Sequence, residues 1–409
     1  MNKYKLIIVF VGLPASGKSY TSHHLCQYLS WLGYKIKIFN TGNYRRLLGN
    51  KIHNADFFNN NNSENLKLRE KYFYYSIFDL NSYLQGKEEG DIAILDATNS
   101  TKKRREKIVR FFSLFPYQKN ILFLENITND RLIIQKNIDF KKNSPDYKDF
   151  TIDFMKNDFE KRFDYYKDVY EDIDDNENLN YIKIYNCGKK VMYNNVYGFV
   201  ETLILNYLIN FTVSTKKIFI SRHGQSLYNL ENRIGGDSSI SQEGIMYARK
   251  LYNYISLNYK KDEIMIFTSK LKRTKETAQL FIENGFHVKH MDILNEINGG
   301  ICENMTYDEV KEKYPDLYAD RKKNKFYYKY PEGESYFDLI IRLKEFILEL
   351  NRMNKTVLII SHNAVIRVLM SYYLKISHHE LPYFDMPLHK LFCIENSEIN
   401  YCYVKNEVL

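Results

Sequence analysis

The chain has 409 residues, which predicts two domains at about 100–200 residues each, both long enough to bury a core. Its 44% hydrophobic and 27% charged residues are typical of a globular protein, and its net charge of +9 includes no long block of like charges, so no nucleic-acid partner is expected. Five cysteines without a Cys-x-x-Cys pair indicate neither disulfides nor a zinc site, and no apolar segment reaches membrane length, so we expect a cytoplasmic protein without a signal peptide or membrane contact.

In the first half of the chain, short apolar runs alternate with helical stretches. This alternation predicts βαβ units and a mainly parallel sheet. Four asparagines at 59–62 predict a disordered surface loop, and the polar stretch 172–180 precedes the last expected strand. The expected strands are 6–11, 36–39, 92–95, 121–124 and 181–184, and the expected helices are 18–32 and 196–208.

A phosphate-binding pattern joins the first strand to the first helix. Gly12, Gly17, Lys18 and Ser19 fit Gly-x-x-x-x-Gly-Lys-Ser, in which backbone N–H groups and the helix N-terminus surround the phosphates. We expect Lys18 to reach the β- and γ-phosphates of ATP and Ser19 to bind Mg²⁺; the alternative is a chance glycine turn. Asp96 ends the strand 92–95, where it either holds Mg²⁺ or caps the next helix.

Transfer of a phosphoryl group also needs positive charge around the acceptor and the moving group. Single surface arginines and lysines are usually just solvated, and their spacing does not choose among them. The candidates in this half are Arg45, Arg46, Arg69, Arg104 and Lys141.

The second half repeats the α/β pattern without repeating the sequence, so the two halves read as a fusion. A connector is expected at 211–216, which places the domains at 1–213 and 214–409. The expected strands 217–221, 264–268 and 356–360 each end in polar residues, and ligands gather at the carboxyl ends of strands in such sheets.

These strand ends carry the residues of a phosphohistidine reaction. His223 in Arg222-His223-Gly is the candidate nucleophile, and His362 and Arg273 are candidates to neutralise phosphate oxygens. Glu296 is the candidate general acid. Taken singly, His362 is more often a core histidine and Glu296 a surface charge. Their order along the chain resembles that of the histidine phosphatase superfamily, which favours catalytic roles for these residues over structural ones.

The first half resembles the kinase domain of the 6-phosphofructo-2-kinase/fructose-2,6-bisphosphatase family, in segments 12–20, 39–46, 96–99, 144–147 and 181–185. The resemblance implies that Lys141 is a second catalytic lysine, with Lys142 as the alternative, and that Ser19 and Asp96 bind the metal. The implied ATP-binding residues are Gly12, Ala15, Ser16, Gly17, Lys18, Ser19 and Tyr20; those implied for fructose 6-phosphate are Arg45, Arg46, Arg69, Thr98, Arg104, Arg162 and Tyr166.

The second half resembles the bisphosphatase domain of the same family, in segments such as 233–238, 294–297, 330–335 and 380–383. Two positions depart from the family pattern: Gln225 stands where Glu is usual and Asn363 where Gln is usual. The loss of a carboxylate at Gln225 would tune the activity without removing nucleophile or acid. The implied bisphosphate-binding residues are Arg222, Asn229, Gly235, Arg273, Tyr307, Arg321, Lys325 and Arg367, with His223, Glu296 and His362 in catalysis.

The resemblance implies a two-domain α/β protein: a P-loop NTPase-type, mainly parallel sheet flanked by helices, then a histidine phosphatase (phosphoglycerate mutase-like) domain. It further implies synthesis of fructose 2,6-bisphosphate with ATP and Mg²⁺, hydrolysis without a cofactor, and a homodimer. Three alternatives stay open: a single retained activity, a silent sensor or scaffold, and a nucleic-acid end-processing kinase–phosphatase.

Overall fold

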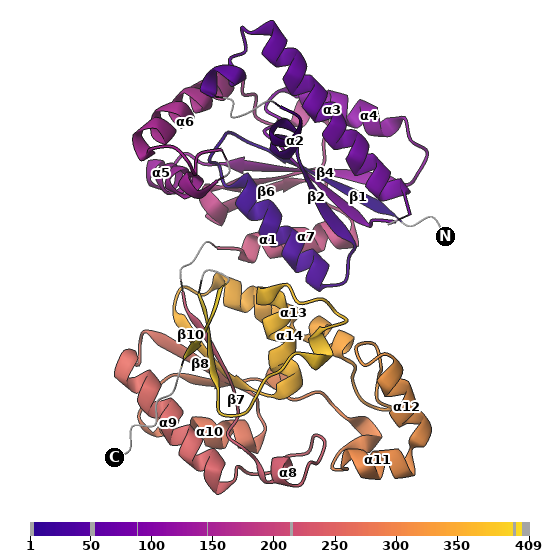
Figure 1. Ribbon diagram of the computed structural model, residues 1–409, viewed down its shortest axis with the longest axis vertical. Helices are drawn as coiled ribbons and strands as arrows, with labels where there is room; N and C mark the ends of the chain where they lie inside the picture. The colour runs from indigo at the N-terminus through magenta and orange to yellow at the C-terminus, as the bar shows by residue number, and fades with distance from the viewer. Residues whose placement is uncertain are drawn as a thin grey trace. The chain divides into compact units, whose positions relative to one another are not determined.

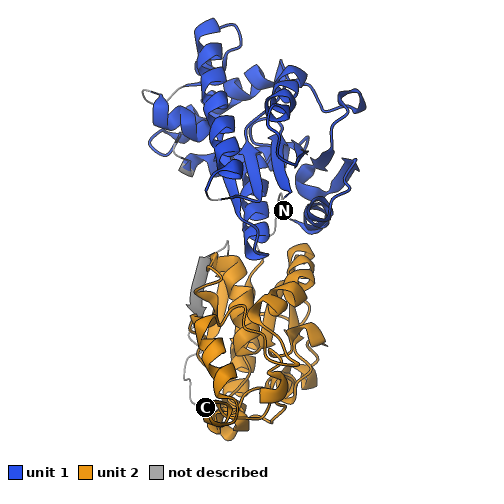
Figure 2. Ribbon diagram, turned by 90° about the vertical axis from the view of Figure 1, so that its right-hand side faces the viewer, with its two compact units in different colours: residues 1–212 blue, residues 213–409 orange. Residues whose placement is uncertain are grey.

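The computed structural model describes residues 4–49, 54–87, 89–144, 146–212, 216–395 and 398–402. The chain forms two compact units, Met1–Thr212 and Val213–Leu409, each with its own sheet (Figure 2). The expected connector 211–216 lies partly outside the described residues. Within the described ranges, no helix is both long and apolar enough to cross a membrane.

Unit 1 contains a six-stranded sheet in the order β2-β3-β1-β4-β5-β6 (Figure 1). All neighbouring pairs are parallel except β5 and β6. Its helices and strands are β1 (Lys5–Val11), α1 (Lys18–Trp31), β2 (Ile36–Asn40), α2 (Thr41–Leu48), α3 (Ser63–Gln85), β3 (Ile92–Asp96), α4 (Lys102–Ser113), β4 (Lys119–Ile127), α5 (Arg131–Asp139), α6 (Ile152–Lys167), β5 (Tyr181–Tyr185), β6 (Lys190–Asn194) and α7 (Phe199–Asn210), with short 3₁₀ turns at Ala55–Phe58, Phe140–Asn143, Asp175–Glu177 and Asn186–Gly188.

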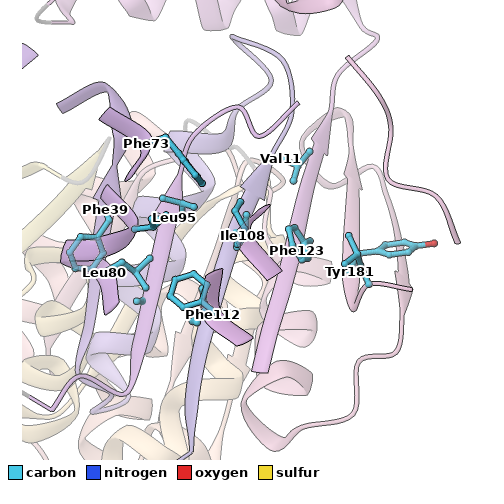
Figure 3. Close-up of a cluster of buried hydrophobic side chains, with 14 of the residues drawn as sticks. Val11, Phe39, Phe73, Leu80, Leu95, Ile108, Phe112, Phe123 and Tyr181 are labelled. Atoms are coloured by element: carbon cyan, nitrogen blue, oxygen red, sulfur yellow. The ribbon is translucent and has the colours of Figure 1, made fainter. Parts of the chain in front are cut away.

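Helices cover both faces of this sheet, which is why its central strands β1 and β3 are mostly apolar. Every residue of β1 is buried. Helices α3 and α4 pack on one face through residues such as Phe73, Leu80 and Phe112, which lie against the strands in Figure 3. Helices α1 and α7 lie on the opposite face, where Tyr28 stacks on Tyr207 with ring centroids 4.4 Å apart. The expected strands and helices of this half are therefore confirmed as a parallel sheet between helices.

The asparagine run is not the disordered loop that its composition predicts. Asn62 is the N-cap of α3 and its side chain accepts from the N–H groups of Glu64 and Asn65. Asn60 donates to the carbonyl of Tyr165 at 2.6 Å. Asparagine side chains make local caps of this kind readily, so a low-complexity run can still take a single conformation.

Unit 2 contains a second six-stranded sheet in the order β12-β11-β7-β10-β8-β9. Strands β7, β8, β9 and β10 are parallel, and β11 and β12 are antiparallel additions. Its elements are β7 (Ile218–Arg222), α8 (Leu227–Leu230), α9 (Gln242–Asn258), β8 (Ile264–Thr268), α10 (Lys272–Glu283), β9 (Val288–His290), α11 (Tyr307–Lys313), α12 (Pro315–Lys323), α13 (Tyr336–Arg352), β10 (Thr356–Ser361), α14 (Asn363–Leu374), β11 (Leu391–Glu395) and β12 (Glu398–Cys402), with 3₁₀ turns at Asp292–Leu294, Gly300–Cys302 and Leu381–Tyr383.

The parallel arrangement brings three strand ends to one edge of the sheet. Strand β10 lies between β7 and β8, with Ser361 opposite Arg222 and Ile360 opposite Thr268. Helices α9 and α10 pack on one face, and α13 packs on the other, where Phe346 meets Phe267 edge to face. The polar groups that follow the three strands therefore converge, as the sequence predicts.

Candidate active sites

The loop between β1 and α1 has the backbone shape of a phosphate cradle. Gly12 has φ 144°, and a Cβ there would come within 2.5 Å of the carbonyl oxygen of Asn126, so only glycine fits without a shift. Its N–H donates to the carbonyl of Thr98 at 3.0 Å. Gly17, with φ 89°, precedes α1 and leaves the helix N-terminus facing the loop.

Neighbouring elements hold this loop through its own carbonyls, and no sequence motif indicates these contacts. Asn137 in α5 donates to the carbonyl of Ala15 at 2.7 Å, and Thr128 donates to that of Ser16 at 3.3 Å. Tyr20 is 44% exposed and packs against His24 with the rings tilted and their centroids 4.3 Å apart. Tyr20 therefore lies on the outer side of α1.

Lys18 is a buried cation with little compensation. Its ammonium donates to the carbonyl of Leu13 at 2.6 Å. Burial lowers the pKa of Lys18 to about 7; Asp96 opposes the shift, whereas Lys141 and Arg162 add to it. A bound polyphosphate would restore the charge balance, so the electrostatics fit a nucleotide phosphate.

Asp96 is the last residue of β3 and is 3% exposed. Its carboxylate accepts from Asn40, the residue opposite it in β2, at 2.6 Å. Asp96 is not a helix cap, because Thr101 caps α4 by accepting from the N–H of Arg104. The described residues contain no cluster of three or more metal-ligating side chains. A Mg²⁺ here would thus take oxygens from Asp96, Ser19 and the phosphates, as this ion usually does.

The two adjacent lysines point to different surroundings. Lys142 donates to the backbone carbonyls of Phe150 and Lys148. The ammonium of Lys141 instead interacts electrostatically with Arg162 and Asp96, and burial lowers its pKa. The structure therefore brings Lys141, and not Lys142, together with Lys18 and Asp96.

Three of the expected arginines surround one carboxylate that was given no role in the sequence analysis. Asp146 accepts from Arg45 at 2.6 Å and from Arg46 at 3.3 Å, and lies 3.9 Å from Arg162. These guanidinium groups hold the pKa of Asp146 below its usual range, against the effect of burial. One negative charge faces three positive ones, so the cluster keeps a positive excess.

The remaining cations continue this cluster. Arg69 donates to the carbonyl of Phe58 at 3.2 Å and to Asn60 at 3.0 Å, so the asparagine run lies beside the expected sugar-phosphate site. Arg104 pairs with Glu70 and lies over the ring of Phe73. Three arginines of this cluster each have a buried nitrogen without a hydrogen bond in the described structure: Arg69 Nε, Arg104 Nη1 and Arg162 Nε. Unsatisfied buried donors are costly, so they indicate a site shaped for an anion.

Tyr166 and Thr98 complete the expected set. The Tyr166 ring packs 5.7 Å from that of Phe58, the residue over which Arg162 lies at 4.1 Å. Thr98 follows Asp96 and connects to the phosphate loop through Gly12. All residues expected for fructose 6-phosphate except Thr98 thus lie in one network of cations and aromatic rings around Phe58 and Phe73.

In unit 2, His223 follows β7 and is 3% exposed. Its Nδ1 lies 2.7 Å from the carbonyl oxygen of Gly224, which requires a proton on Nδ1 and leaves the lone pair on Nε2. Burial, with the charges of Arg273 and Arg222, lowers the pKa of His223 well below its usual value. The imidazole is therefore neutral and suited to nucleophilic attack.

His362, at the end of β10, lies beside the nucleophile with a ring-centroid distance of 5.2 Å. Its Nδ1 accepts from Arg273 Nε at 3.2 Å, so its Nε2 carries the proton and donates to Ser269 at 2.7 Å. Burial lowers the pKa of His362 well below its usual value. Arg273 is further fixed by a 2.7 Å bond to the carbonyl of Gly236.

Glu296 reaches the same site from the segment after β9. Its Oε1 accepts from its neighbour Ile297 at 2.9 Å and from the N–H of Ala364, at the start of α14, at 3.3 Å. Burial raises the pKa of Glu296, against the opposing effects of Arg273 and Arg222. A carboxyl whose pKa is raised although two guanidinium groups lie nearby is suited to protonate a leaving oxygen.

Three cations of this unit are fixed by one stretch of backbone, which we call the carbonyl strap (residues 382–386). Arg222 donates to Met386 at 2.8 Å, Arg367 to Phe384 at 2.6 Å and Lys325 to Pro382 at 2.9 Å. Burial, with the charges of Arg321 and Arg367, lowers the pKa of Lys325 to about 8. The three carbonyls carry no net charge, and Asp385 is the one acidic residue of the strap, acting electrostatically on Arg222. Lys325 and Arg367 therefore keep their positive charge for an anionic ligand.

The other residues expected to contact the bisphosphate are held by separate partners. Arg321 donates to the hydroxyl of Tyr307 at 3.2 Å. Asn229 is engaged in a capping box with Ser226, its Oδ1 accepting at 3.0 Å. Gly235 has φ 61° and faces Glu303, so a side chain there would clash.

The two departures from the family pattern have distinct surroundings. Gln225 accepts from Ser241, the N-cap of α9, at 2.9 Å, and its N–H donates to His389 at 3.1 Å. Asn363 begins α14 with a buried Oδ1 that makes no hydrogen bond in the described structure. Arg342, which the sequence analysis missed, contacts the segment that carries Glu296.

Two family models each match one half of the chain. The family model of 6-phosphofructo-2-kinase matches residues 1–215, and that of the histidine phosphatase superfamily (branch 1) matches residues 218–401. An alpha-ribazole phosphatase structure from Shigella flexneri covers 46% of this chain and 94% of its own, at 18% identity and a TM-score of 0.41.

Full-length relatives span both units. The 6-phosphofructo-2-kinase/fructose-2,6-bisphosphatase of Gallus gallus is 41% identical over 94% of this chain and 80% of its own. The fructose-2,6-bisphosphatase of Saccharomyces cerevisiae is 39% identical over 96% and 86%. Since these matches run through the phosphate loop and the paired histidines alike, the chain belongs to the 6-phosphofructo-2-kinase/fructose-2,6-bisphosphatase family.

Proposed function

We propose that this chain is a bifunctional enzyme that makes fructose 2,6-bisphosphate from ATP and fructose 6-phosphate and hydrolyses it back, and so controls the balance of glycolysis and gluconeogenesis. One observation carries the proposal: in each unit, residues expected to transfer a phosphoryl group lie together. Lys18 lies with Asp96 and Lys141 in unit 1. His223 lies with His362 and Arg273 in unit 2.

In the kinase reaction, the phosphate loop and Lys18 hold the β- and γ-phosphates of ATP. Asp96 and Ser19 would hold Mg²⁺, which neutralises charge on the nucleotide phosphates. The arginines around Asp146 and Phe58 bind the 6-phosphate and orient the 2-hydroxyl towards the γ-phosphorus. Lys141 then stabilises the transferring group. Positioning and charge supply most of the rate for such a loose transition state.

In the bisphosphatase reaction, His223 Nε2 attacks the 2-phosphorus while the bond to the sugar oxygen breaks. Glu296 gives its proton to that oxygen, which releases fructose 6-phosphate and leaves a phosphohistidine. Water then attacks the phosphohistidine, and the Glu296 carboxylate takes the proton. Arg222, Arg273 and His362 hold the phosphoryl oxygens throughout, and Asn229 assists them.

The rest of the sugar bisphosphate is assigned to Tyr307, Arg321, Lys325 and Arg367, with Gly235 allowing close approach. We expect no further cofactor in this half. The 6-phosphate would take the Lys325 and Arg367 donors that now contact the carbonyl strap.

The protein is further proposed to act in the cytoplasm as a homodimer. Strand β6 is an edge of its sheet, and exposed apolar side chains lie on it and just beyond it. These side chains are Met192, Tyr193, Tyr197 and Phe199, of which Tyr197 and Phe199 are 83% and 79% exposed. Exposed apolar groups beside an open strand edge favour pairing with a second copy. Sedimentation of Tyr197→Glu should show more monomer than the natural chain.

The two-site assignment is tested by separate substitutions. Lys18→Met should abolish synthesis and spare hydrolysis, and His223→Ala should do the reverse. The assignment is wrong if Lys18→Met retains synthesis or His223→Ala retains hydrolysis.

The alternatives are separated by measuring both turnover numbers on one preparation. The yeast relative is named for one activity alone, so a chain with only one measurable rate would favour a single retained function. ATP binding without either turnover would identify a silent sensor. Tight binding of an oligonucleotide at moderate salt would favour the end-processing reading.

A further inference from the structure

The segment that precedes Glu296 is fixed by side chains at every carbonyl. Its residues 292–295 join β9 to the catalytic carboxyl in a 3₁₀ turn followed by extended backbone. Arg342, in the middle of α13, supplies most of the donors, and Ser361 of β10 supplies one. Arg342 donates to Asp292 at 3.2 Å, to Ile293 at 3.4 Å and to Asn295 at 3.0 Å, and Ser361 donates to Leu294 at 2.8 Å.

The other side of Glu296 is held by the partner of this arginine. Glu334 accepts from Arg342 at 3.1 Å and from the N–H of Asn298 at 3.0 Å. The N–H of Glu334 donates in turn to the carbonyl of Asn298 at 2.9 Å. The Glu334–Arg342 pair therefore makes hydrogen bonds to the backbone both before and after Glu296.

The position of Glu296 depends on these backbone hydrogen bonds, because its own side chain accepts few hydrogen bonds in the described structure. Both bonds that it accepts go to Oε1, one from its neighbour Ile297 and a longer one from Ala364. Neither fixes the direction of the other oxygen. The position of the carboxyl therefore follows from the backbone that carries it, and that backbone is held by Arg342.

We propose that Arg342, supported by Glu334, is a positioning residue of the bisphosphatase reaction: it sets the place from which Glu296 delivers its proton. This inference rests on the proposed role of Glu296. Arginine suits the task because its planar fork reaches three carbonyls and a carboxylate at once, which an ammonium cannot do.

A positioning role for Arg342 predicts an effect on rate that depends on the leaving group, which general destabilisation of the protein does not produce. Proton donation matters for a strongly basic leaving oxygen, such as the sugar alkoxide, and little for a weakly basic one, such as p-nitrophenolate. Displacing Glu296 should therefore slow hydrolysis of fructose 2,6-bisphosphate while leaving attack on p-nitrophenyl phosphate almost intact.

The experiment compares Arg342→Gln, Arg342→Lys and Glu296→Gln in the full chain, with both substrates. Arg352→Gln is the matched control, since this arginine is exposed at the end of the same helix. Synthesis by unit 1 and thermal melting report whether each variant is folded. If Arg342→Gln does not fold, Arg342→Lys and Glu334→Gln replace it.

In the first turnover, which ends at the phosphohistidine, we expect Arg342→Gln to lose about 10–100-fold with fructose 2,6-bisphosphate and less than about 3-fold with p-nitrophenyl phosphate, a part of the 10²–10⁴ that general acids supply. Later turnovers also use Glu296 as the base of the water step, which both substrates share, so they do not separate the two. Arg342→Lys should lose less, and Arg342→Gln should add little to Glu296→Gln because both act through one carboxyl. Equal losses on the two substrates, or none, would overturn the inference. If Glu296→Gln itself shows no substrate-dependent loss, the assigned proton donor is wrong instead.

Discussion

The buried ion pair between α4 and the stretch 171–177 allows a prediction of stability. Arg105 is fully buried, and its guanidinium binds both carboxylate oxygens of Glu177 at 2.7 Å. It also donates to the carbonyls of Glu171 and Asn99 at 2.9 and 3.3 Å. Glu177→Gln removes the negative charge and keeps the shape, so Arg105 remains buried as an uncompensated cation.

Breaking a buried pair on one side costs about 3–5 kcal/mol. At a slope of about 2.5 kcal/mol per M urea, the unfolding midpoint of unit 1 should fall by about 1–2 M. Trp31, the only tryptophan of the chain, is buried in α1, so its fluorescence reports on unit 1 alone. Urea titration of tryptophan fluorescence is therefore the assay, and bisphosphatase activity gives an internal reference for unit 2.

An exposed pair joining the same two elements provides the control. Lys102 and Asp174 are 38% and 39% exposed, so Lys102→Ala should leave the midpoint unchanged within error. The double variant Arg105→Met/Glu177→Met should be more stable than Glu177→Gln, because no unpaired charge remains. A midpoint shift below about 0.4 M for Glu177→Gln, equivalent to about 1 kcal/mol, would refute the reasoning.

Three further outcomes are expected. Lys141→Met should reduce synthesis at least about 100-fold, whereas Lys142→Met should change it less than about 3-fold; equal effects in kinase assays would contradict the placement of these lysines. The hydrolysis rate should fall as pH rises through the raised pKa of Glu296, because Glu296 must be protonated. It should also fall as pH decreases through the lowered pKa of His223, because His223 must be neutral. Glu296→Gln should remove only the alkaline limb of the pH profile, and an alkaline limb that persists in this variant would exclude Glu296 as the source of the limb. Gln225→Glu should move the acidic limb to higher pH, since a nearby carboxylate favours imidazolium, and leave synthesis unchanged; an unmoved limb would show that this position does not act on the nucleophile.

Much of the fold could be predicted because its central strands are buried on both faces. β1, β3 and β8 are continuous apolar runs bounded by polar residues, and the sequence places them within a residue of their observed ends. Strands β6, β9, β11 and β12 were missed. β6 and β9 are edge strands whose exposed and half-buried residues give no such run. β11 is a short buried run, and no motif drew attention to it. β4 is longer than expected because Glu125 is buried inside it and pairs with Lys183 at 3.2 Å.

The residues of the two sites also differ in how well the sequence predicts them. Local motifs were sufficient to propose Lys18 and His223, because their function requires a particular neighbouring sequence. The choice between Lys141 and Lys142 needed the tertiary structure, since it depends on carbonyls of residues 148 and 150. Arg342 could not be found from sequence at all, because its partners are backbone carbonyls, which every residue carries.

The carbonyl strap limits which changes this part of the chain can tolerate. Its three acceptors are at residues 382, 384 and 386, so every second carbonyl faces the cations. Replacing a side chain leaves these oxygens in place, whereas deleting one residue would shift the alternation and turn them away. Among natural variants, the length of the strap should stay constant, whereas an exposed side chain such as that of Tyr383 can vary.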